Sequence, residues 1–297
     1  MPDISLVQPL LEASVTPLIA FTLWTAGLGM GMSIQAADII ESLGRRRLVA
    51  ATIVLDIALV PIAMWVMVQL LQIEDGLATG LLLVAFASAG PLGIKLAAVA
   101  GADTAFAIGI VVALELANIV IVPVWVAVLG VAIGMEVVTE IIVALVVFVL
   151  LPIGVGQAIG RIKRGRSERC VSLAVRASSV GLALTIATIV ARDIQVVSTT
   201  IASAAGLAAA AVVSFALVAG WFVGGPERST RLATSLVTGT RANAVALAVA
   251  STAFAADPQV LTGALTAGLV SITLPGLLAM VVSRWRGSPL PTVQRPE

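Results

Sequence analysis

The sequence predicts an all-α polytopic membrane protein with about nine transmembrane helices. Of the 297 residues, 60% are hydrophobic and only 11% are charged, whereas a typical soluble domain has about 25% charged residues. The chain also divides at its polar positions into nine apolar stretches, each close to the roughly 20 residues that a helix needs to cross a bilayer. These stretches are rich in Ala, Leu and Val and lack the alternation of membrane β-strands, so we expect helices rather than a barrel.

Charged residues mark most boundaries between the expected spans. The cluster that begins at Arg45 follows the first span, Arg192 follows the sixth and Arg228 follows the seventh. Asp103 separates the third span from the fourth, and Asp257 separates the eighth from the ninth. The expected spans lie near residues 14–35, 48–71, 76–101, 104–130, 136–159, 170–191, 199–223, 229–254 and 258–283, followed by a cytoplasmic tail at 285–297.

Most basic residues fall in loops on one side of this expected topology. Clusters of Lys and Arg follow the first, fifth, seventh and ninth spans, whereas Arg192 stands alone on the opposite side. Because positively charged loops stay in the cytoplasm, we expect the N-terminus outside the cell and the C-terminus inside. The excess of Arg over Lys suggests a GC-rich bacterial genome, so we expect a multi-pass protein of the bacterial plasma (inner) membrane.

Two apolar segments about 155 residues apart read alike. The first begins with Leu77-Ala78-Thr79 and runs through Asp103 to Pro123, and the second begins with Leu232-Ala233-Thr234 and runs through Asp257 to Pro275. They are offset by five spans, and an odd offset inverts the second copy relative to the first. Inverted repeats of this kind place two interrupted helices against each other in the middle of the membrane.

Each copy carries residues that interrupt a helix. In the first copy, Pro91 suits the first turn of a new half-helix and drives Gly90 toward an extended backbone. The second copy has no proline, so its expected break rests on Gly239 and the polar residues that follow it. The alternative is that Gly and Pro, which are common in membrane helices, merely kink these two.

Charged residues inside the expected spans need a partner or a function, because burying a charge in a bilayer is costly. Lys95 follows the first break, Glu115 lies in the middle of the fourth span, and Arg241 lies at the second break. If the two broken helices cross, Lys95 and Arg241 face one cationic cavity suited to an anion. The alternative is a structural ion pair of Glu115 with Lys95 or with Arg241.

Other polar residues in the spans are candidates for the same site. Asp56, in the second span, is expected either to carry a proton or to cap a neighbouring helix break. Ser88, Asn118, Thr240 and Asn243 are expected to complete a binding site, although each is as well explained by a hydrogen bond between helices. The chain contains no histidine, and we expect no metal, no cofactor and no nucleic acid among its ligands.

At these positions the sequence resembles the bile acid:sodium symporter superfamily, in particular its short bacterial members. The resemblance is carried by Gly29–Ser33, Gly76–Leu81, the Gly90-Pro91 break with Lys95 and Asp103, Gly224-Gly225-Pro226, Gly239–Asn243 and Asp257-Pro258. It implies two inverted repeats divided into a panel domain and a core domain. The panel would hold the first, fifth and sixth spans, and the core would hold the other six, including two crossing broken helices.

The sequence departs from this family where sodium ligands are expected. Sodium-coupled members carry a Ser-Asn pair after the first break, but Gly93-Ile94 stands here. They carry a glutamate at the second break, where this chain has Val237 or Thr238, and Arg241 replaces a glutamine. Because a hard cation requires several oxygen ligands, our hypothesis is that Lys95 and Arg241 take the place of sodium. Lys95 and Glu115 would then exchange a proton.

The sequence therefore indicates a secondary active transporter of a small organic anion that is sodium-independent or proton-coupled. One alternative is a sodium-coupled symporter, and another is a membrane receptor or sensor that keeps the fold without transport. An enzyme with Ser88 as nucleophile and Lys95 as base is disfavoured, because these residues lie on opposite sides of a helix break. No phosphate-binding loop for ATP is present.

Overall fold

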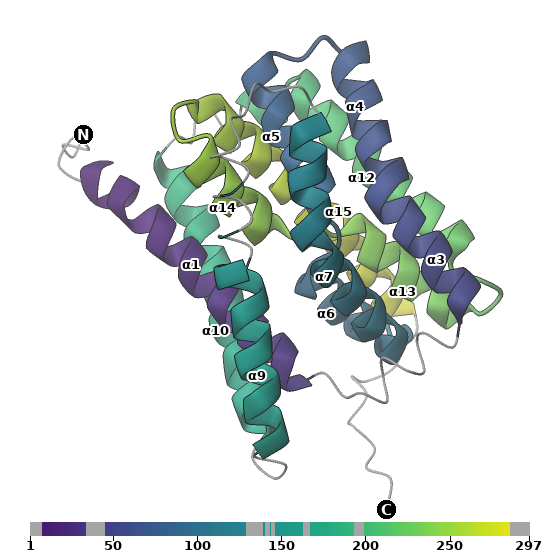
Figure 1. The fold of residues 1–297 in the computed structure, drawn as a ribbon. Helices are drawn as coiled ribbons and strands as arrows, with labels where there is room; N and C mark the ends of the chain where they lie inside the picture. The colour runs from purple at the N-terminus through teal and green to yellow at the C-terminus, as the bar shows by residue number, and fades with distance from the viewer. Residues whose placement is uncertain are drawn as a thin grey trace, which may run out of the picture.

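A computed structural model describes residues 8–33, 45–128, 139, 143, 146–162, 167–192 and 199–285. Every regular element in these ranges is helical (Figure 1). In chain order they are α1 (Gln8–Ser33), α3 (Arg46–Val54), η2 (Leu55–Leu59), α4 (Val60–Leu70), α5 (Asp75–Phe86), α6 (Pro91–Val99), α7 (Thr104–Val128), η3 (Val146–Leu150), α9 (Leu151–Ile162), α10 (Ser167–Arg192), α12 (Ala204–Val223), α13 (Arg228–Gly239), α14 (Asn243–Ala253) and α15 (Pro258–Trp285). The predicted all-α class is confirmed.

Several of these helices are long and apolar enough to cross a membrane. Within the described ranges they are Arg46–Leu70, Ala204–Val223, Arg228–Ala253 and Pro258–Trp285. The pair α5 and α6 makes a fifth span if its two halves, bent by 64°, are counted together. The count of nine spans stays a prediction, because parts of the expected segments 104–130 and 136–159, and nearly all of the tail at 285–297, lie outside the described residues.

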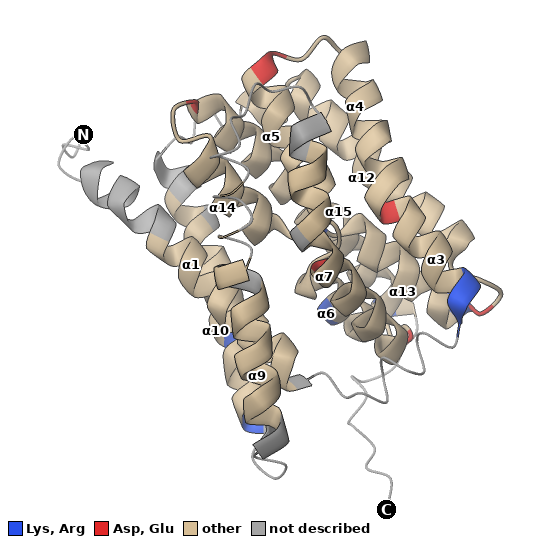
Figure 2. Ribbon diagram, in the orientation of Figure 1, with Lys and Arg blue, Asp and Glu red and all other residues tan. Residues whose placement is uncertain are grey.

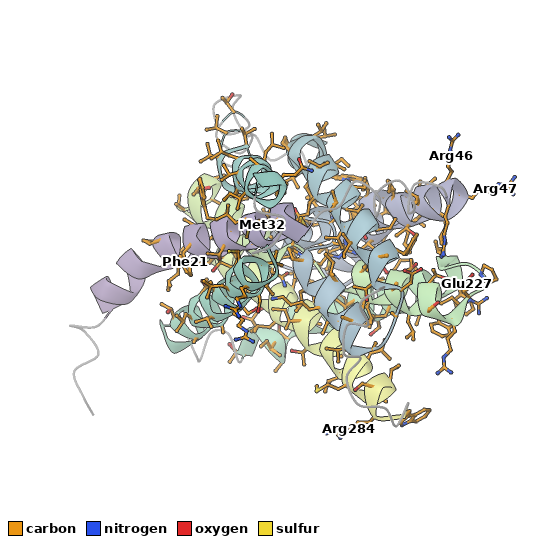
Figure 3. All side chains as sticks on the ribbon, turned by 90° about the horizontal axis from the view of Figure 1, so that it is seen from below. Phe21, Met32, Arg46, Arg47, Glu227 and Arg284 are labelled. Carbon is orange, nitrogen blue, oxygen red and sulfur yellow. The ribbon has the colours of Figure 1, made fainter. Side chains whose placement is uncertain are left out.

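Large apolar side chains cover much of the outer surface. Phe222 is 76% exposed, Leu70 is 71% exposed and Trp65 is 50% exposed. Contiguous apolar surface of this kind marks contact with another apolar phase, which for long apolar helices is the lipid. The described basic residues at the starts of α3 and α10 lie toward one end of the molecule (Figure 2). Viewed from below, Arg46, Arg47 and Arg284 project at the periphery (Figure 3).

The helices form two groups that lie side by side (Figure 1). In the first group, α1 packs along both α9 and α10, and η3 runs directly into α9 and also contacts α1. Two glycines bring α1 and α9 close together: a Cβ on Gly31 would lie 2.1 Å from the Ile153 carbonyl, and one on Gly156 would lie 2.4 Å from the Leu28 carbonyl. Small residues permit such close packing of membrane helices.

The second group contains the remaining helices and most of the buried core. Here α5 packs on α15, and α12 packs on α13 and α15. The backbones of α5 and α15 touch, since a Cβ on Gly80 would lie 2.1 Å from the Val260 carbonyl and one on Gly263 would lie 2.3 Å from the Leu77 carbonyl. These two helices come from different sequence repeats, so the two copies are packed into one unit.

The span formed by α3, η2 and α4 contains a π-helical turn at Leu55–Leu59, and such turns often occur at functional sites. Pro61 follows this turn and has no N–H to offer the Ile57 carbonyl four residues earlier. The indole Nε1 of Trp125 on α7 donates a hydrogen bond of 2.9 Å to that carbonyl. Trp125 is itself stacked on Phe86, with ring centroids 5.1 Å apart. The irregular turn that carries Asp56 is thus supported by α7.

Candidate functional site

The first helix interruption lies between α5 and α6. The segment from Ala87 to Gly90 is not helical, and Gly90 has an extended backbone with φ −109° and ψ 175°. Pro91 is the first residue of α6, where its missing N–H costs no helical hydrogen bond. The break that the Gly-Pro dipeptide predicts therefore lies at that dipeptide.

The second interruption lies between α13 and α14 and uses no proline. Helix α13 ends at Gly239, Thr240 is extended with φ −93° and ψ 150°, and α14 begins at Asn243. Gly239 serves packing, because a Cβ there would lie 2.4 Å from a side-chain carbon of Leu217. Thr240 is fully buried and its hydroxyl donates to the carbonyls of Leu236 and Val237, both at 3.0 Å.

The two interruptions cross in direct contact. The backbone N–H of Ala242 donates a 2.9 Å hydrogen bond to the Ser88 carbonyl, so one break satisfies a backbone group of the other. A Cβ on Gly90 would lie 3.0 Å from Ala242 Cα, and one on Gly93 would lie 2.7 Å from the Thr240 hydroxyl. Glycine at both positions lets the two interrupted helices approach each other closely.

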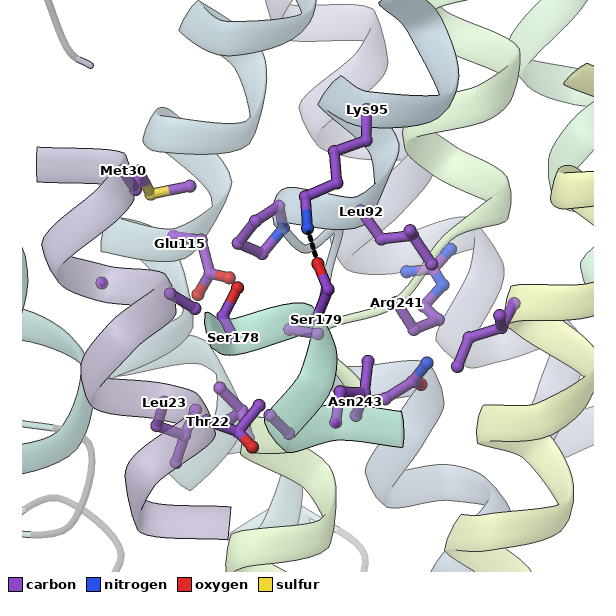
Figure 4. Close-up of a pocket in the computed structure, with 18 of the residues that line it drawn as sticks. Thr22, Leu23, Met30, Leu92, Lys95, Glu115, Ser178, Ser179, Arg241 and Asn243 are labelled. Carbon is purple, nitrogen blue, oxygen red and sulfur yellow. Dashed lines mark hydrogen bonds between the residues drawn. The ribbon is translucent and has the colours of Figure 1, made fainter. Parts of the chain in front are cut away.

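A cavity of about 280 Å³ lies between this crossing and the group formed by α1, α9 and α10. Its wall combines the start of α6, the start of α14, Glu115 of α7 and residues of the opposite helix group (Figure 4). The lining residues are Thr22, Leu23, Ala26, Gly27, Met30, Pro91, Leu92, Lys95, Glu115, Ile153, Ser178, Ser179, Leu182, Ala183, Arg241, Ala242, Asn243, Ala244, Val245 and Ile272.

Arg241 forms an ion pair that removes most of its charge from the cavity. Its guanidinium binds the Asp56 carboxylate, and the two side chains are 3% and 0% exposed. The same guanidinium donates to the Thr238 carbonyl at 2.7 Å, near the C-terminal end of α13. Within the described part of the chain, the second oxygen of Asp56 has no hydrogen-bond partner. Asp56 thus lies against the second break, where it is the ionic partner of Arg241.

Lys95 points into the cavity and reaches the opposite helix group. Its ammonium donates to the Ser179 hydroxyl and, at 3.3 Å, to the Val175 carbonyl, both on α10 (Figure 4). Lys95 belongs to α6, so this contact joins the two helix groups across the space between them. A group that bound the ammonium from within the cavity would compete with α10 for it.

Glu115 is a buried carboxylate on the cavity wall. It is 4% exposed, and Asn118 donates to it at 3.4 Å. The Asn118 side-chain oxygen accepts from the Ser88 backbone N–H at 3.1 Å and from its hydroxyl at 2.5 Å. Ser88 and Asn118 are thus brought together, behind the cavity and not on its lining. They brace the first break against α7.

The remaining candidate residues divide between the cavity and the protein interior. Asn243 lines the cavity, where its amide accepts from Ser271 at 3.1 Å and donates to the Gly268 carbonyl at 3.3 Å. Thr240 contributes to the crossing but does not line the cavity.

The alternative ion pair of Glu115 with Lys95 or Arg241 is not formed. Among the described residues Arg241 pairs with Asp56, and Lys95 binds α10 instead. Sequence reasoning missed this partner of Arg241. It also missed Thr22, Ser178 and Ser179, which form the polar part of the opposite wall. The adjacent pair Ser178-Ser179 near the middle of a span was the available signal for that wall.

Comparison with known families supplies the identity of the chain. Residues 18–200 match the model of the Sodium Bile acid symporter family, which is more than half of the sequence. The match includes the first break and Lys95 and ends before the second break. A search of curated proteins gave no match. The chain therefore belongs to the sodium bile acid symporter family and is a multi-pass membrane transporter of that type, not an enzyme.

Proposed function

We propose that this protein is a sodium-independent secondary active transporter of a small organic anion. The observation that supports the proposal is the cavity between the two helix groups, into which Lys95 projects from the helix crossing. The cavity volume of about 280 Å³ lies just below the range of about 300–1,000 Å³ that is usual for small-molecule pockets. The substrate is accordingly small.

Transport in this proposal is an alternating movement of the two helix groups. Helices α1, α9 and α10 act as the panel, and the remaining helices act as the core that carries the crossing. The cavity lies between them, so sliding one group past the other would open it to each side in turn. We place the protein in the plasma membrane with its N-terminus outside and its C-terminus in the cytoplasm, following the positive-inside rule.

Lys95 is the proposed anion ligand. Arg241 supports the site at the crossing, but its ion pair with Asp56 leaves Lys95 as the cation of the cavity lining that has no ionic partner among the described residues. Asn243 would contact the substrate, whereas Thr240, Ser88 and Asn118 would hold the breaks in place. Lys95, Glu115 and Asp56 are the groups available to exchange a proton, because each lies buried or half-buried near the crossing.

The environment of Arg241 supports sodium independence. Its guanidinium is surrounded by the Asp56 carboxylate and by the Thr238 carbonyl, the oxygen ligands that a hard cation would use. A guanidinium that binds these oxygens competes with a mobile cation for them. The name of the matched family favours the alternative of sodium coupling. A receptor that keeps the fold without transport is the second alternative.

Counterflow and uptake in proteoliposomes test the proposal. Small carboxylates would first be screened by thermal shift with and without Na⁺, because a ligand that binds the folded protein raises its melting temperature. Labelled ligand would then exchange across the membrane, which separates a carrier from a receptor. We expect equal uptake with an inward Na⁺ gradient and with a matched K⁺ gradient at constant pH. Stimulation by Na⁺ alone would contradict sodium independence.

A further inference from the structure

We infer that the substrate is a zwitterion, whose anionic group binds Lys95 and whose ammonium group binds Glu115. This inference rests on the proposed transport function and refines its substrate from a simple anion to a carboxylate-type compound that also carries an ammonium group. It follows from the charges that remain on the cavity wall after the Arg241–Asp56 pair is set aside. That pair carries no net charge, and both of its side chains are buried.

Two charged side chains of opposite sign then line the cavity. Lys95 reaches it from α6 and Glu115 from α7, and both ends face the same space near Ser178 and Ser179 (Figure 4). Lys95 is held by neutral oxygens of α10. In the described ranges, Glu115 accepts a side-chain hydrogen bond only from the amide of Asn118, at 3.4 Å. Neither charge has an ionic partner among the described residues.

A simple anion would supply a partner of opposite charge to only one of these two side chains. Its carboxylate would attract Lys95 but would bring a second negative charge into a mostly apolar space whose wall already carries Glu115. Charges repel strongly where water is excluded, and a buried charge requires a partner. A ligand with both a carboxylate and an ammonium group supplies each wall charge with its partner and adds no net charge.

The rest of the cavity defines the body of this ligand. Leu23, Ala26, Ile153, Leu182, Val245 and Ile272 supply an apolar lining. Together with the volume of about 280 Å³, this lining fits a short aliphatic chain between or beside the two charged ends. The geometry therefore assigns the site to compounds of the amino-acid type.

Matched pairs of ligands test the inference on the full-length protein. Each pair shares a carbon skeleton and differs in the amino group: γ-aminobutyrate with butyrate, β-alanine with propionate, and leucine with isocaproate. Affinity is measured by thermal shift and calorimetry in detergent. We expect at least one zwitterion to bind at least tenfold more tightly than its partner, a difference of about 1.4 kcal/mol, because only the zwitterion gives Glu115 a charged hydrogen-bond donor.

Substitutions test which ligand group each of the two charged side chains binds. Glu115→Gln should abolish the preference for the zwitterion of a pair and let the simple anion bind equally well or better. Lys95→Met should weaken both members. Glu74→Gln is the matched control, because this exposed carboxylate lies in the loop before α5, outside the cavity. It should leave every affinity unchanged.

The outcomes separate this inference from the proposed function. Binding of simple anions that depends on Lys95 and matches or exceeds binding of the zwitterions would overturn the inference and leave anion transport standing. Failure of every pair to bind would overturn both. The comparison of wild-type ligand pairs needs no variant, so it decides the question even if Glu115→Gln does not fold.

Discussion

Lys95 and Arg241 are the two cations of the crossing, one from each broken helix, yet their surroundings differ. Arg241 lies within its break, is 4% exposed and is paired with a fully buried carboxylate. Lys95 lies one turn into its half-helix, is half-buried and is held by a hydroxyl and a carbonyl of the other helix group. One cation is fixed inside one helix group, whereas the other bridges the two helix groups.

This difference shows that charge and burial do not by themselves define a ligand site. Arg241 satisfies the charge of Asp56 and the carbonyl of Thr238 inside one helix group. Lys95 joins two groups that must separate if the cavity is to open. We expect substitutions of Arg241 to act chiefly on stability and substitutions of Lys95 to act chiefly on binding.

The largest effect is expected from Arg241→Gln. It leaves Asp56 buried without its cation, and breaking a buried ion pair by removing one partner costs about 3–5 kcal/mol. Melting of the purified protein in detergent measures this loss. Asp56→Asn combined with Arg241→Gln should recover part of it, because the double variant buries no lone charge. Arg228→Gln, at an exposed position of α13, is the matched control. If Arg241→Gln melts at the same temperature as this control, Arg241 does not stabilise the fold and the proposed difference between Arg241 and Lys95 is wrong.

Lys95→Met should act on the ligand and leave the fold nearly unchanged. A hydrogen bond to a charged group contributes about 1.5–3 kcal/mol, so affinity for the ligand found by the screen should fall roughly 10- to 150-fold. The melting temperature without ligand should change little, because the ammonium is bound only by Ser179 and Val175. Retention of full affinity would show that Lys95 is a structural contact and not a ligand group.

The sequence was sufficient to predict the fold class, the family and the position of the first break. Composition and span length predict membrane helices, and the Gly90-Pro91 dipeptide carries its own local signal for an interruption. The second break has a weaker local signal, since only Gly239 and polar residues precede Asn243. Its position in the structure nevertheless agrees with its expected place, because the crossing backbone of the first break packs against it.

The pairing of charges could not be predicted in the same way. Asp56 and Arg241 are 185 residues apart, and no periodicity connects them. Which carboxylate meets Arg241 depends on how the span of α3, η2 and α4 packs around the crossing. Likewise, the contact of Lys95 with Ser179 depends on how the two helix groups face each other. Sequence spacing describes single helices, whereas these contacts are set by tertiary packing.

Gly93→Ala tests whether the two breaks must touch. The new Cβ would lie 2.7 Å from the Thr240 hydroxyl and 3.1 Å from Val237 Cα, and overpacking of this kind costs about 1–3 kcal/mol. We expect a lower melting temperature and weaker ligand binding. The control is Gly154→Ala in α9, where no atom lies within 4 Å of the new Cβ. Equal behaviour of the two variants would contradict the close crossing on which the comparison of Lys95 and Arg241 depends.

The smallest effect is expected from Trp125→Phe, which tests the support of the turn that carries Asp56. Phenylalanine keeps a ring beside Phe86 but removes the N–H that donates to the Ile57 carbonyl. An intramolecular hydrogen bond contributes about 0.5–1.5 kcal/mol, and melting should show a loss of that order. Pro61→Ala restores a backbone N–H four residues after Ile57, so the loss should be smaller in a Pro61→Ala background. Equal losses in both backgrounds would show that α7 supports Asp56 through packing alone, and that the fixed cation at Arg241 does not depend on this hydrogen bond.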